Sequence, residues 1–412
     1  MGQSGKFLVT NEGRFDLSTN MWDDQLFSDI LVRDNPIDTE KAMGISRALR
    51  AEILRMEFQT ITMSFIEKMI EAKLMEFGLT KPSPIRLDQS IFVENRLVLS
   101  DNAKRVLRRR YLKKDSRGKV IETPEQMFRR VACHIAKAEK KYGADEMRVK
   151  ELEEIFYKIM TEFKFLPNSP TLMNAGRRLG QLAACFVLPV EDSMDGIFGA
   201  LRNAALIHKS GGGTGFAFSR LRPKNSMVGT TGGVASGPVS FMKIFNTATE
   251  QVKQGGTRRG ANMAILKVDH PDIMEFIFSK RDNADLNNFN ISVGVSDAFM
   301  KAAADKAEYD LIDPRNQTHV GKLNAAEVYH ALVKQAWKNG DPGIIFLDRI
   351  NRDNPTPVLG EIESTNPCGE QPLLPLEACN LGSVNLAKFV VENGDGPMID
   401  YEGLKEIVTL SV

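Results

Sequence analysis

Beyond Phe165 the chain alternates between short apolar runs and longer segments with apolar residues at helical spacing. The apolar runs are AACFVLPV, GFAFSRL, FNISVGVS and PGIIFLD, and the helical segments are SMDGIFGALRNAALIHKS, GPVSFMKIFNTATEQVK and AAEVYHALVKQAWKNG. Strands that alternate with helices are typical of α/β domains with parallel strands. The glycine-rich connectors KSGGGTGF and VGTTGGVASG predict loops where the backbone closely approaches another group. We therefore expect an α/β domain over residues 166–412.

The first 165 residues are predicted to be mostly helical. Four segments carry apolar residues at helical spacing, namely 45–58, 61–77, 124–141 and 145–163. The stretch FGLTKPSPIRLDQS contains two prolines and predicts a linker, and Ile91–Leu99 predicts a short strand. This pattern divides the region into a helical N-terminal domain, 1–90, and a second helical part, 91–165.

Composition and charge exclude several classes of protein. The 412 residues suffice for two or three domains, and the formal net charge of +1 gives no general attraction to nucleic acid or to an anionic membrane. The sequence contains no run of about 18 apolar residues, and its start, MGQSGKFLVTNEGRF, lacks the apolar core of a signal peptide. The basic stretch AKRVLRRRYLKKDSRGK is interpreted as a solvated helix end and turn, with a nucleic-acid patch as the alternative. We expect a cytoplasmic protein without a nucleic-acid or membrane partner.

The four cysteines limit the chemistry further. Cys133, Cys185, Cys368 and Cys379 form no CxxC pair, which argues against a structural zinc site. Cys133 lies in a helical pattern and is interpreted as a buried core thiol. Cys368 and Cys379 both lie in the stretch STNPCGEQPLLPLEACNLGS. In a reducing compartment, such cysteines are more often catalytic or metal-binding than structural.

Within this stretch, an amide and a carboxylate flank the first thiol. Asn366, Cys368 and Glu370 are spaced two residues apart, so on an extended segment their side chains would share one face. A nearby carboxylate raises the pKa of a thiol, which makes a poor thiolate nucleophile. The pattern instead suits a neutral thiol that carries a hydrogen atom. The alternative is a turn-rich loop with a buried cysteine.

The stretch resembles the finger loop in the large catalytic chain of ribonucleotide reductases, and its NPCGE form resembles the adenosylcobalamin-dependent class II enzymes. Further matching segments follow the same order along the chain, namely FLPNSPTLMNAG, ACFVLPVEDSM, GGGTGF, LRPKNSMV, SGPVSFMKIFN, KQGGTRRGANMAIL, HPDIMEFI and GDPGIIFLD. The resemblance covers residues 99–412. It implies an α/β fold, the first part of the family's ten-stranded α/β barrel, preceded by a mostly helical N-terminal domain.

The resemblance implies catalytic roles for five residues. Cys368 would be the thiyl radical site that abstracts the 3′ hydrogen of a ribonucleotide, Glu370 the general base on the 3′-OH, and Asn366 the group that holds the substrate hydroxyl. Cys185 and Cys379 would be the reducing pair, which becomes a disulfide as the 2′-OH leaves as water. A disulfide needs Cα atoms within about 7 Å, so the two segments must be neighbours. The alternative is two unrelated core cysteines.

The resemblance also implies nucleotide contacts. Ser169, Ala184 and Gly213 would line the substrate, although Ala184 stands where many members carry serine. Taken alone, KSGGGTGF is a weak phosphate-cradle motif, because it lacks the Gly-Lys-Ser/Thr ending of a P-loop.

A second nucleotide site is implied for a deoxynucleoside triphosphate or ATP effector at the edge of a homodimer. Asp192, Ser193 and Arg222 match residues that hold the effector's sugar and phosphates. The loop KQGGTRR would lie between effector and substrate and relay the choice of base; its candidate residues are Lys253, Gln254 and Arg258. The alternative for this loop is an exposed basic turn.

The two ends of the chain carry further expectations. MSFIEKMIEAKLMEFGL resembles the last helices of an ATP-cone, but the usual Lys-Arg-Asp-Gly opening is missing, so residues 1–90 would be a degenerate cone whose nucleotide binding is open. The ending EGLKEIVTLSV stops within a helical pattern. It suggests a truncated chain or a second polypeptide that supplies the rest of the barrel and the cysteine pair that takes electrons from a thioredoxin-type reductant.

Two other functions stay open at this point. The chain resembles, less closely, the large subunit of class I reductases, which depend on a separate metal-radical protein. It would alternatively be a non-catalytic regulatory or assembly partner that binds deoxynucleotide effectors. In either reductase class, the substrate is a ribonucleotide and the cofactor requirement differs: adenosylcobalamin in class II, a metal-radical subunit in class I.

Overall fold

The computed structural model describes residues 8–10, 17–18, 24–56, 60–79, 82–83, 85, 87, 97, 99–229, 232–254, 258–281, 285–394 and 396–412. Most of the strand predicted at 91–99 and the tip of the KQGGTRR loop lie outside these residues.

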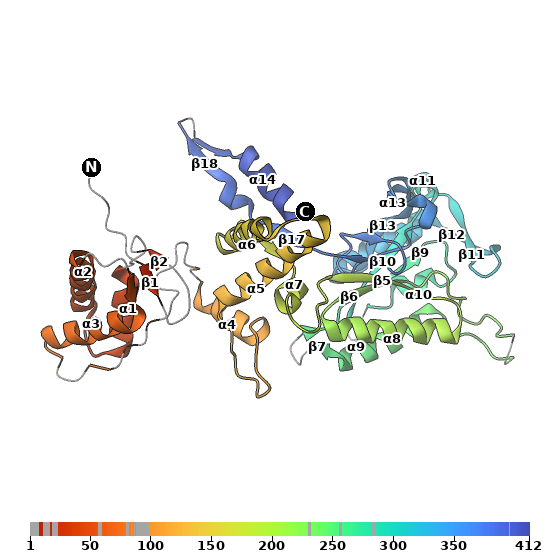
Figure 1. The fold of residues 1–412 in the computed structure, drawn as a ribbon. Coiled ribbons are helices and arrows are strands. Elements are labelled where there is room, and N and C mark those ends of the chain that lie inside the picture. The colour runs from red at the N-terminus through yellow and green to blue at the C-terminus, as the bar shows by residue number, and fades with distance from the viewer. Residues whose placement is uncertain are drawn as a thin grey trace.

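The N-terminal unit contains three helices and a small sheet (Figure 1). The helices are α1 (Asp24–Asp34), α2 (Thr39–Arg55) and α3 (Met63–Glu76), and the strands β1 (Leu8–Thr10), β2 (Leu17–Ser18) and β3 (Thr60–Thr62) pair in the order β2-β1-β3. The side chains of Asp38 and Thr62 cap α2 and α3 by accepting backbone N–H groups. Ile45, Ile66 and Ile70 are fully buried between the helices. The two helices predicted here are present; their descent from an ATP-cone stays a prediction.

A second helical region follows. It contains α4 (Asp101–Arg110), α5 (Pro124–Ala136), the 3₁₀ helix η3 (Lys137–Tyr142), α6 (Glu146–Thr161) and α7 (Ser169–Asn174). Thr123 and Gln126 form a capping box at the start of α5. All ten residues of the basic helix α4 are described, and none is buried, which agrees with a solvated helix. Helices α5 and α6 pack through Phe128, Val131 and Met160, each at most 3% exposed.

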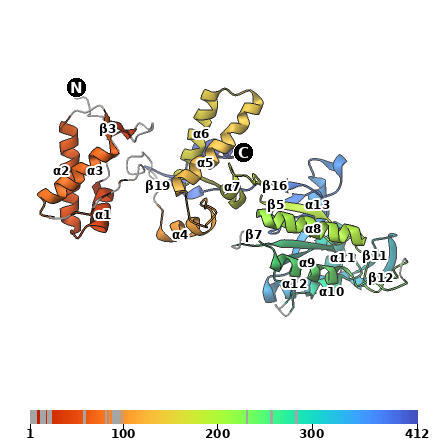
Figure 2. The ribbon, with the colours of Figure 1, turned by 60° about the horizontal axis from the view of Figure 1, so that its bottom comes forward.

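The centre of the chain is a six-stranded sheet (Figures 1 and 2). Its order is β13 (Gly343–Phe346), β10 (Phe289–Val295), β9 (Asn262–Lys267), β6 (Gly213–Ala217), β5 (Cys185–Pro189) and β16 (Ala378–Cys379). The first five strands are parallel to one another and β16 is antiparallel to β5. The four predicted apolar runs therefore supply parallel strands β5, β6, β10 and β13, and the α/β prediction is confirmed.

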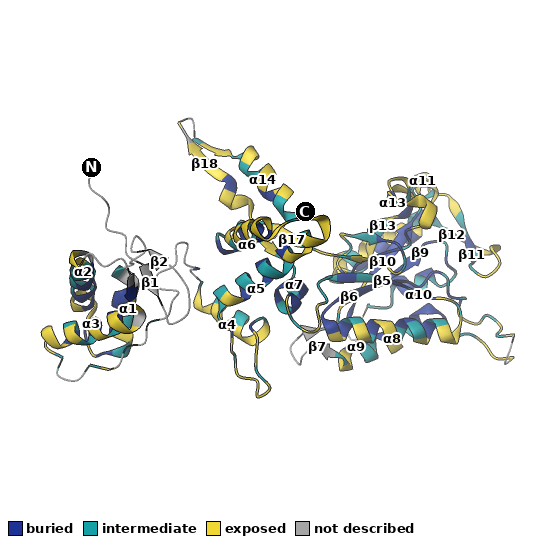
Figure 3. Cartoon of the chain, in the orientation of Figure 1, coloured by how far each residue is buried: buried dark blue, intermediate teal, exposed yellow. Residues whose placement is uncertain are grey.

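The two faces of this sheet differ because side chains alternate along each strand. One face carries Phe216, Leu266 and Val293, which are fully buried against α8 (Met194–Ser210), α9 (Pro238–Gln251), α10 (Ile273–Ile277), α11 (Asp297–Asp305) and α12 (Ala325–Asn339). Most residues of β5, β6, β9 and β10 are therefore buried, which is dark blue in Figure 3. The opposite face carries small residues, such as Gly213, Gly215 and Gly294. That face leaves room for a loop.

The remaining elements connect the sheet to its surroundings. The hairpin β11 (Glu308–Asp313) and β12 (Thr318–Asn324) precedes α12, and α13 (Leu347–Arg352) and η4 (Pro357–Leu359) follow β13. Strand β4 (Phe165–Pro167) pairs with β17 (Gly382–Val384), and η5 (Leu386–Phe389), β18 (Val390–Asn393), β19 (Gly396–Ile399) and α14 (Tyr401–Ser411) complete the chain. Among the helices that the structure describes, none combines the length and apolar character needed to cross a bilayer.

Candidate active site

The fold brings two distant cysteines together. In the antiparallel pair of β5 and β16, Cys185 is the direct partner of Cys379, and Ala184 N donates to Cys379 O at 2.8 Å. Directly opposed residues in such a pair have Cα atoms about 4.5–5.5 Å apart, within the range of a disulfide. All four cysteines lie in the described part of the chain, and none of them forms a disulfide there. The expectation that these two segments are neighbours is confirmed.

Both members of this pair are held as thiols. Cys185 is 7% exposed, and burial raises its pKa to about 12. Burial likewise raises the pKa of Cys379. The negative charge of Glu370 raises the pKa of both thiols further. Glu370 therefore lies close enough to act on the cysteine pair.

The stretch NPCGE forms the tip of a hairpin over residues 364–373. Strands β14 (Ser364–Thr365) and β15 (Pro372–Leu373) pair, and Asn366 N donates to Gln371 O at 3.1 Å. The Asn366 side chain closes the loop, because its Oδ1 accepts from Gln371 N at 3.0 Å. Its Nδ2 donates to Cys185 Sγ at 3.5 Å. One amide thus joins the hairpin to the cysteine pair.

The expected extended geometry of this stretch is wrong. Residues 366–371 form a tight turn with Gly369 at φ +86°, so alternation along a strand does not apply. Asn366 is fully buried, whereas Cys368 and Glu370 are exposed. The turn places the amide beneath the loop and the thiol and carboxylate on its open side.

Two glycines of GGGTGF seat this hairpin on the sheet. A Cβ on Gly215 would lie 1.7 Å from Thr365 O, and a Cβ on Gly213 would lie 2.6 Å from Pro367 Cγ. Asn290 Nδ2 donates to Pro367 O at 2.7 Å, so strand β10 also holds the loop in place. The close backbone approach predicted for this glycine run is therefore made to the NPCGE hairpin.

A buried polar network supports the same strand from the other face. Thr214 Oγ1 donates to Asn262 Oδ1 at 2.6 Å, so it accepts from Nε2 of His208, 2.9 Å away. Asn262 Nδ2 donates to Thr249 Oγ1 at 3.0 Å. Burial lowers the pKa of His208 to about 4, so this imidazole is neutral at pH 7. The network ties α8, β6, β9 and α9 together beneath Gly213 and Gly215, and the sequence interpretation missed it.

The predicted substrate residues border the cysteine pair to different degrees. Gly213 N donates to Ala184 O at 2.8 Å, so these two residues adjoin each other at the start of β5 and β6. Ser169 begins α7 and its Oγ lies 2.9 Å from the Tyr111 hydroxyl. The preceding residue, Asn168, donates from its backbone to Leu381 O, two residues beyond Cys379. Contact of these residues with substrate stays a prediction.

Three of the predicted effector residues, Asp192, Ser193 and Arg222, line a separate cavity of about 590 Å³. Arg222 Nε donates to both carboxylate oxygens of Asp192, at 3.1 and 2.9 Å. Ser193 caps α8 by accepting from Gly196 N at 3.0 Å. Gly237, the N-cap residue of α9, also lines the cavity. Two helix N-termini therefore meet at this cavity, which favours anionic groups.

The predicted relay loop lies at the other end of α9. Its backbone forms the pair β7 (Lys253–Gln254) and β8 (Arg258–Arg259). The 14-residue α9 separates it from the effector cavity by about 21 Å, at 1.5 Å per residue. A single chain thus brings Asp192, Ser193 and Arg222 together but does not bring the loop to them.

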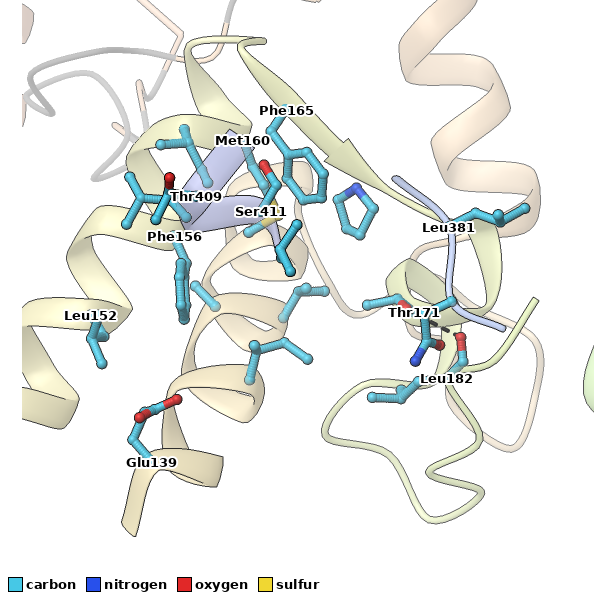
Figure 4. Close-up of a pocket in the computed structure, with 18 of the residues that line it drawn as sticks. Glu139, Leu152, Phe156, Met160, Phe165, Thr171, Leu182, Leu381, Thr409 and Ser411 are labelled. Carbon is cyan, nitrogen blue, oxygen red and sulfur yellow. Dashed lines mark hydrogen bonds between the residues drawn. The ribbon is translucent and has the colours of Figure 1, made fainter. Parts of the chain in front are cut away.

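A further cavity of about 490 Å³ lies in the helical region (Figure 4). Leu152 and Phe156 of α6 line one side, and the last turn of α14 lines another. Near Leu381, Thr171 donates to Leu182 O at 3.2 Å. None of the predicted site residues whose side chains are described lines this 490 Å³ cavity. In the described ranges, no three His, Cys, Asp or Glu side chains gather in a way that could hold a metal ion.

Comparison with known proteins agrees with this geometry. Models of the ribonucleotide reductase barrel domain and all-alpha domain match residues 183–412 and 97–180. The chain is 51% identical over 370 residues to the vitamin B12-dependent ribonucleoside-diphosphate reductase of Thermoplasma acidophilum, which covers 77% of this chain and 48% of that protein. It is 44% identical over 360 residues to the enzyme of the same name from Mycobacterium tuberculosis, with coverages of 84% and 51%.

A relative without B12 in its name is less similar. The ribonucleoside-diphosphate reductase large subunit of Vaccinia virus is 28% identical over 340 residues, with coverages of 75% and 42%. The chain spans about half the length of the curated relatives it matches. Because the barrel-domain match covers more than half of the chain, and the same residues form the parallel sheet, the cysteine pair and the NPCGE hairpin, the chain belongs to the ribonucleotide reductase family.

Proposed function

We propose that this chain carries the site at which a ribonucleotide is reduced to a 2′-deoxyribonucleotide. The observation that carries the proposal is the contact between the NPCGE hairpin and the opposed cysteines, made by Asn366 Nδ2 and Cys185 Sγ at 3.5 Å. It puts an exposed thiol, a carboxylate and a dithiol within one site. These are the groups that a radical dehydration followed by a two-electron reduction requires.

Each group has a defined task in this reaction. A thiyl radical at Cys368 takes the 3′ hydrogen atom of the ribose, and Glu370 takes the proton of the 3′-OH. The 2′-OH then leaves as water with one thiol proton, and Cys185 and Cys379 supply two electrons and become a disulfide. The second thiol hydrogen goes to C2′. Return of the hydrogen atom from Cys368 to C3′ and of the proton from Glu370 to the 3′ oxygen completes the product. The balance is one ribonucleotide and two thiols giving one deoxyribonucleotide, one disulfide and one water.

The protein acts mainly by position in this scheme. The Asn366 side chain fixes the turn that presents Cys368, and Gly215 allows the hairpin to lie against β6. The raised pKa values of the cysteine pair keep both sulfurs protonated at pH 7, so that protons and electrons are available together. A dithiol must be regenerated after each turnover, which implies a thioredoxin-type reductant and a reducing compartment, the cytoplasm.

We propose adenosylcobalamin as the radical source. The B12-dependent relatives are 44–51% identical to this chain, against 28% for the viral large subunit. Bound adenosylcobalamin supplies a carbon-centred radical by homolysis. Cys368 is an exposed residue at the hairpin tip, a position compatible with a large cofactor bound beside the hairpin. The names of the relatives favour a ribonucleoside diphosphate as substrate.

The cavity at Asp192, Ser193 and Arg222 is proposed as the effector site for a deoxynucleoside triphosphate. Its Arg222 guanidinium and two helix N-termini suit a polyphosphate. One reason to expect a homodimer is that Met194 (61% exposed), Phe198 (43%) and Leu206 (53%) present apolar surface on the outside of α8, with the exposed Arg202 between Phe198 and Leu206. Antiparallel pairing of two such helices would bring the loop with Lys253, Gln254 and Arg258 of one chain toward the effector cavity of the other.

The test is an assay of the natural protein that contains this chain, purified with any partner it carries. It is supplied with CDP, adenosylcobalamin and dithiothreitol, and dCDP is measured. We expect activity in the wild type, loss of activity in Cys368→Ser, and retained activity in Cys133→Ser as the matched control. Glu370→Gln should stop turnover while cobalamin homolysis continues.

Two outcomes would redirect the proposal. Activity that ignores cobalamin and needs a di-iron or di-manganese protein would assign the chain to the class I reductases and leave the Cys368 role intact. Deoxynucleotide binding without turnover under any radical source would instead favour a regulatory partner.

A further inference from the structure

The segment HPDIMEFI has no task in the reaction, yet its first residues are locked to the effector cavity. His270 is 2% exposed and lies three residues after the end of β9. Its Nδ1 accepts from Asp272 N at 3.0 Å, so Nε2 carries the proton and donates to Leu221 O at 2.8 Å. Leu221 and the adjoining Arg222 both line the cavity. The imidazole therefore fixes the backbone that presents the arginine.

Asp272 holds the same loop by a second bond. It is the N-cap residue of α10, a position where an aspartate normally accepts from its own helix. Within the described residues its side chain caps nothing in α10. Its Oδ2 instead accepts from Lys224 N at 2.8 Å. The Asp272 carboxylate therefore holds the backbone at Lys224, far away in the sequence, and does not cap its own short helix.

The far end of the loop meets the same carboxylate. Gly237, the N-cap of α9, has φ +80°, and a Cβ there would lie 2.8 Å from Asp272 Oδ2 and 3.0 Å from Lys224 Cβ. Next to Lys224 in the sequence, Asn225 N donates to Ala235 O at 2.9 Å and joins the two sides of the loop. Lys224, in the described stretch 222–229, and Gly237, at the end of the described stretch 232–237, thus both meet Asp272. These two stretches supply one wall of the cavity, through residues 228–229 and 234–237.

We propose that the His270–Asp272 turn is the positioning element of the effector site, and that it presents the wall formed by the described stretches 222–229 and 232–237 to the polyphosphate of a nucleotide. The proposal rests on the effector role proposed above for Asp192, Ser193 and Arg222. Asp272 and His270 are positioning residues in this view, because they act through the backbone of Leu221, Lys224 and Gly237. Neither residue is among those that line the effector cavity.

The sign of the effect separates this role from simple electrostatics. An aspartate near a polyanion repels it, so removal of the charge alone would tighten nucleotide binding. Removal of the bond to Lys224 N would instead loosen the wall and weaken binding. Asp272→Asn removes the charge and keeps an oxygen that can accept this bond, whereas Asp272→Ala removes both.

The experiment measures dTTP binding by calorimetry to the natural protein and to three variants. We expect Asp272→Ala to bind at least tenfold more weakly than wild type, and Asp272→Asn to stay within threefold. Glu275→Ala is the matched control, because Glu275 also contacts Lys224, through an exposed ion pair between Oε2 and Nζ at 3.0 Å. It should bind dTTP as the wild type does. Equal or tighter binding by Asp272→Ala would overturn the proposal.

Hydrogen–deuterium exchange without nucleotide separates this proposal from the effector role. Asp272→Ala should speed exchange at least fivefold in peptides from 222–237 and leave the core strand β9 unchanged, whereas Glu275→Ala should change neither. If Asp272→Ala speeds exchange throughout the chain, this variant is generally unfolded. The proposal then depends on Asp272→Asn, which should show the exchange of the wild type. Unchanged exchange in 222–237 would overturn it. If exchange in Asp272→Ala is faster only in 222–237 but the wild type does not bind dTTP, Asp272 holds this loop in place. The effector role, and with it the positioning of a nucleotide, would then be refuted.

Discussion

Cys185 and Cys379 face each other across the antiparallel pair of β5 and β16, although they lie far apart in the sequence. Asn366 Nδ2 donates to the first of these sulfurs from the base of the hairpin that carries Cys368. The register alone places the pair at disulfide distance, whereas the third cysteine lies on the open side of the hairpin.

Mild oxidation should therefore produce one specific bond. We expect diamide to form the Cys185–Cys379 disulfide, and dithiothreitol to reverse it, while Cys368 remains alkylatable. Peptide mapping by mass spectrometry after alkylation measures this, with Cys133→Ser as a control that should give the same map. A dominant bond between Cys368 and Cys379 would contradict the assigned roles.

Gly215→Ala should lower turnover at the active site and leave the effector cavity unchanged. Its Cβ would meet Thr365 O at 1.7 Å, so the hairpin must move away from β6. A displacement of about 1 Å at a catalytic group can lower turnover about 100-fold. The control is Gly321→Ala in β12, where the nearest atom to the new Cβ is Leu311 Cδ1 at 3.8 Å. Comparable turnover in the two variants would show that the close contact between the hairpin and Gly215 is not needed for catalysis.

Arg222→Ala should weaken dTTP binding by about 1.5–3 kcal/mol, the usual contribution of a hydrogen bond to a charged group. The substitution also leaves the Asp192 carboxylate without its guanidinium partner, next to the incoming phosphates. Calorimetry gives the affinity. Arg352→Ala is the matched control, because it removes an exposed ion pair to Asp297 (3.5 Å) away from the cavity. Equal affinities for all three proteins would refute the site.

Acid should destabilise the fold partly through His208. Burial lowers the pKa of this imidazole to about 4, from an ordinary value near 6.5, so the neutral form is bound into the network with Thr214. A depressed pKa stabilises the native state above pH 6.5, and this contribution is lost as the pH falls toward 4. The loss amounts to at most about 3.5 kcal/mol at 1.4 kcal/mol per pKa unit. Urea unfolding of wild type and His208→Gln at several pH values measures it: the difference in unfolding free energy should shrink between pH 6.5 and 4, and a constant difference would argue against it.

Sequence periodicity predicted many of the helices and four of the six strands in the central sheet, but not β9 or β16. The apolar runs of β5, β6 and β10 were recognisable because these parallel strands are mostly buried, whereas β13 was recognisable as a short apolar run although it is an edge strand with no buried residue. Helices α8, α9 and α12 were recognisable because one stripe of each packs on the sheet. Local spacing could not determine what lies between segments remote in the chain. It predicted an extended NPCGE stretch, where the structure has a turn closed by the Asn366 side chain.

The tertiary structure alone decided the site. Cys379 meets Cys185 through a strand of two residues, β16, too short to leave a periodic pattern. Gly215 is needed because Thr365 lies against it, and Asp272 reaches Lys224 across the end of the sheet, contacts that depend on strand order and not on neighbouring residues. The sequence supplied the chemical groups, since residue types limit the reactions available. Their distances, burial and pKa values arose only when the parallel sheet brought its strands into register, because those quantities belong to pairs of groups that the chain itself keeps far apart.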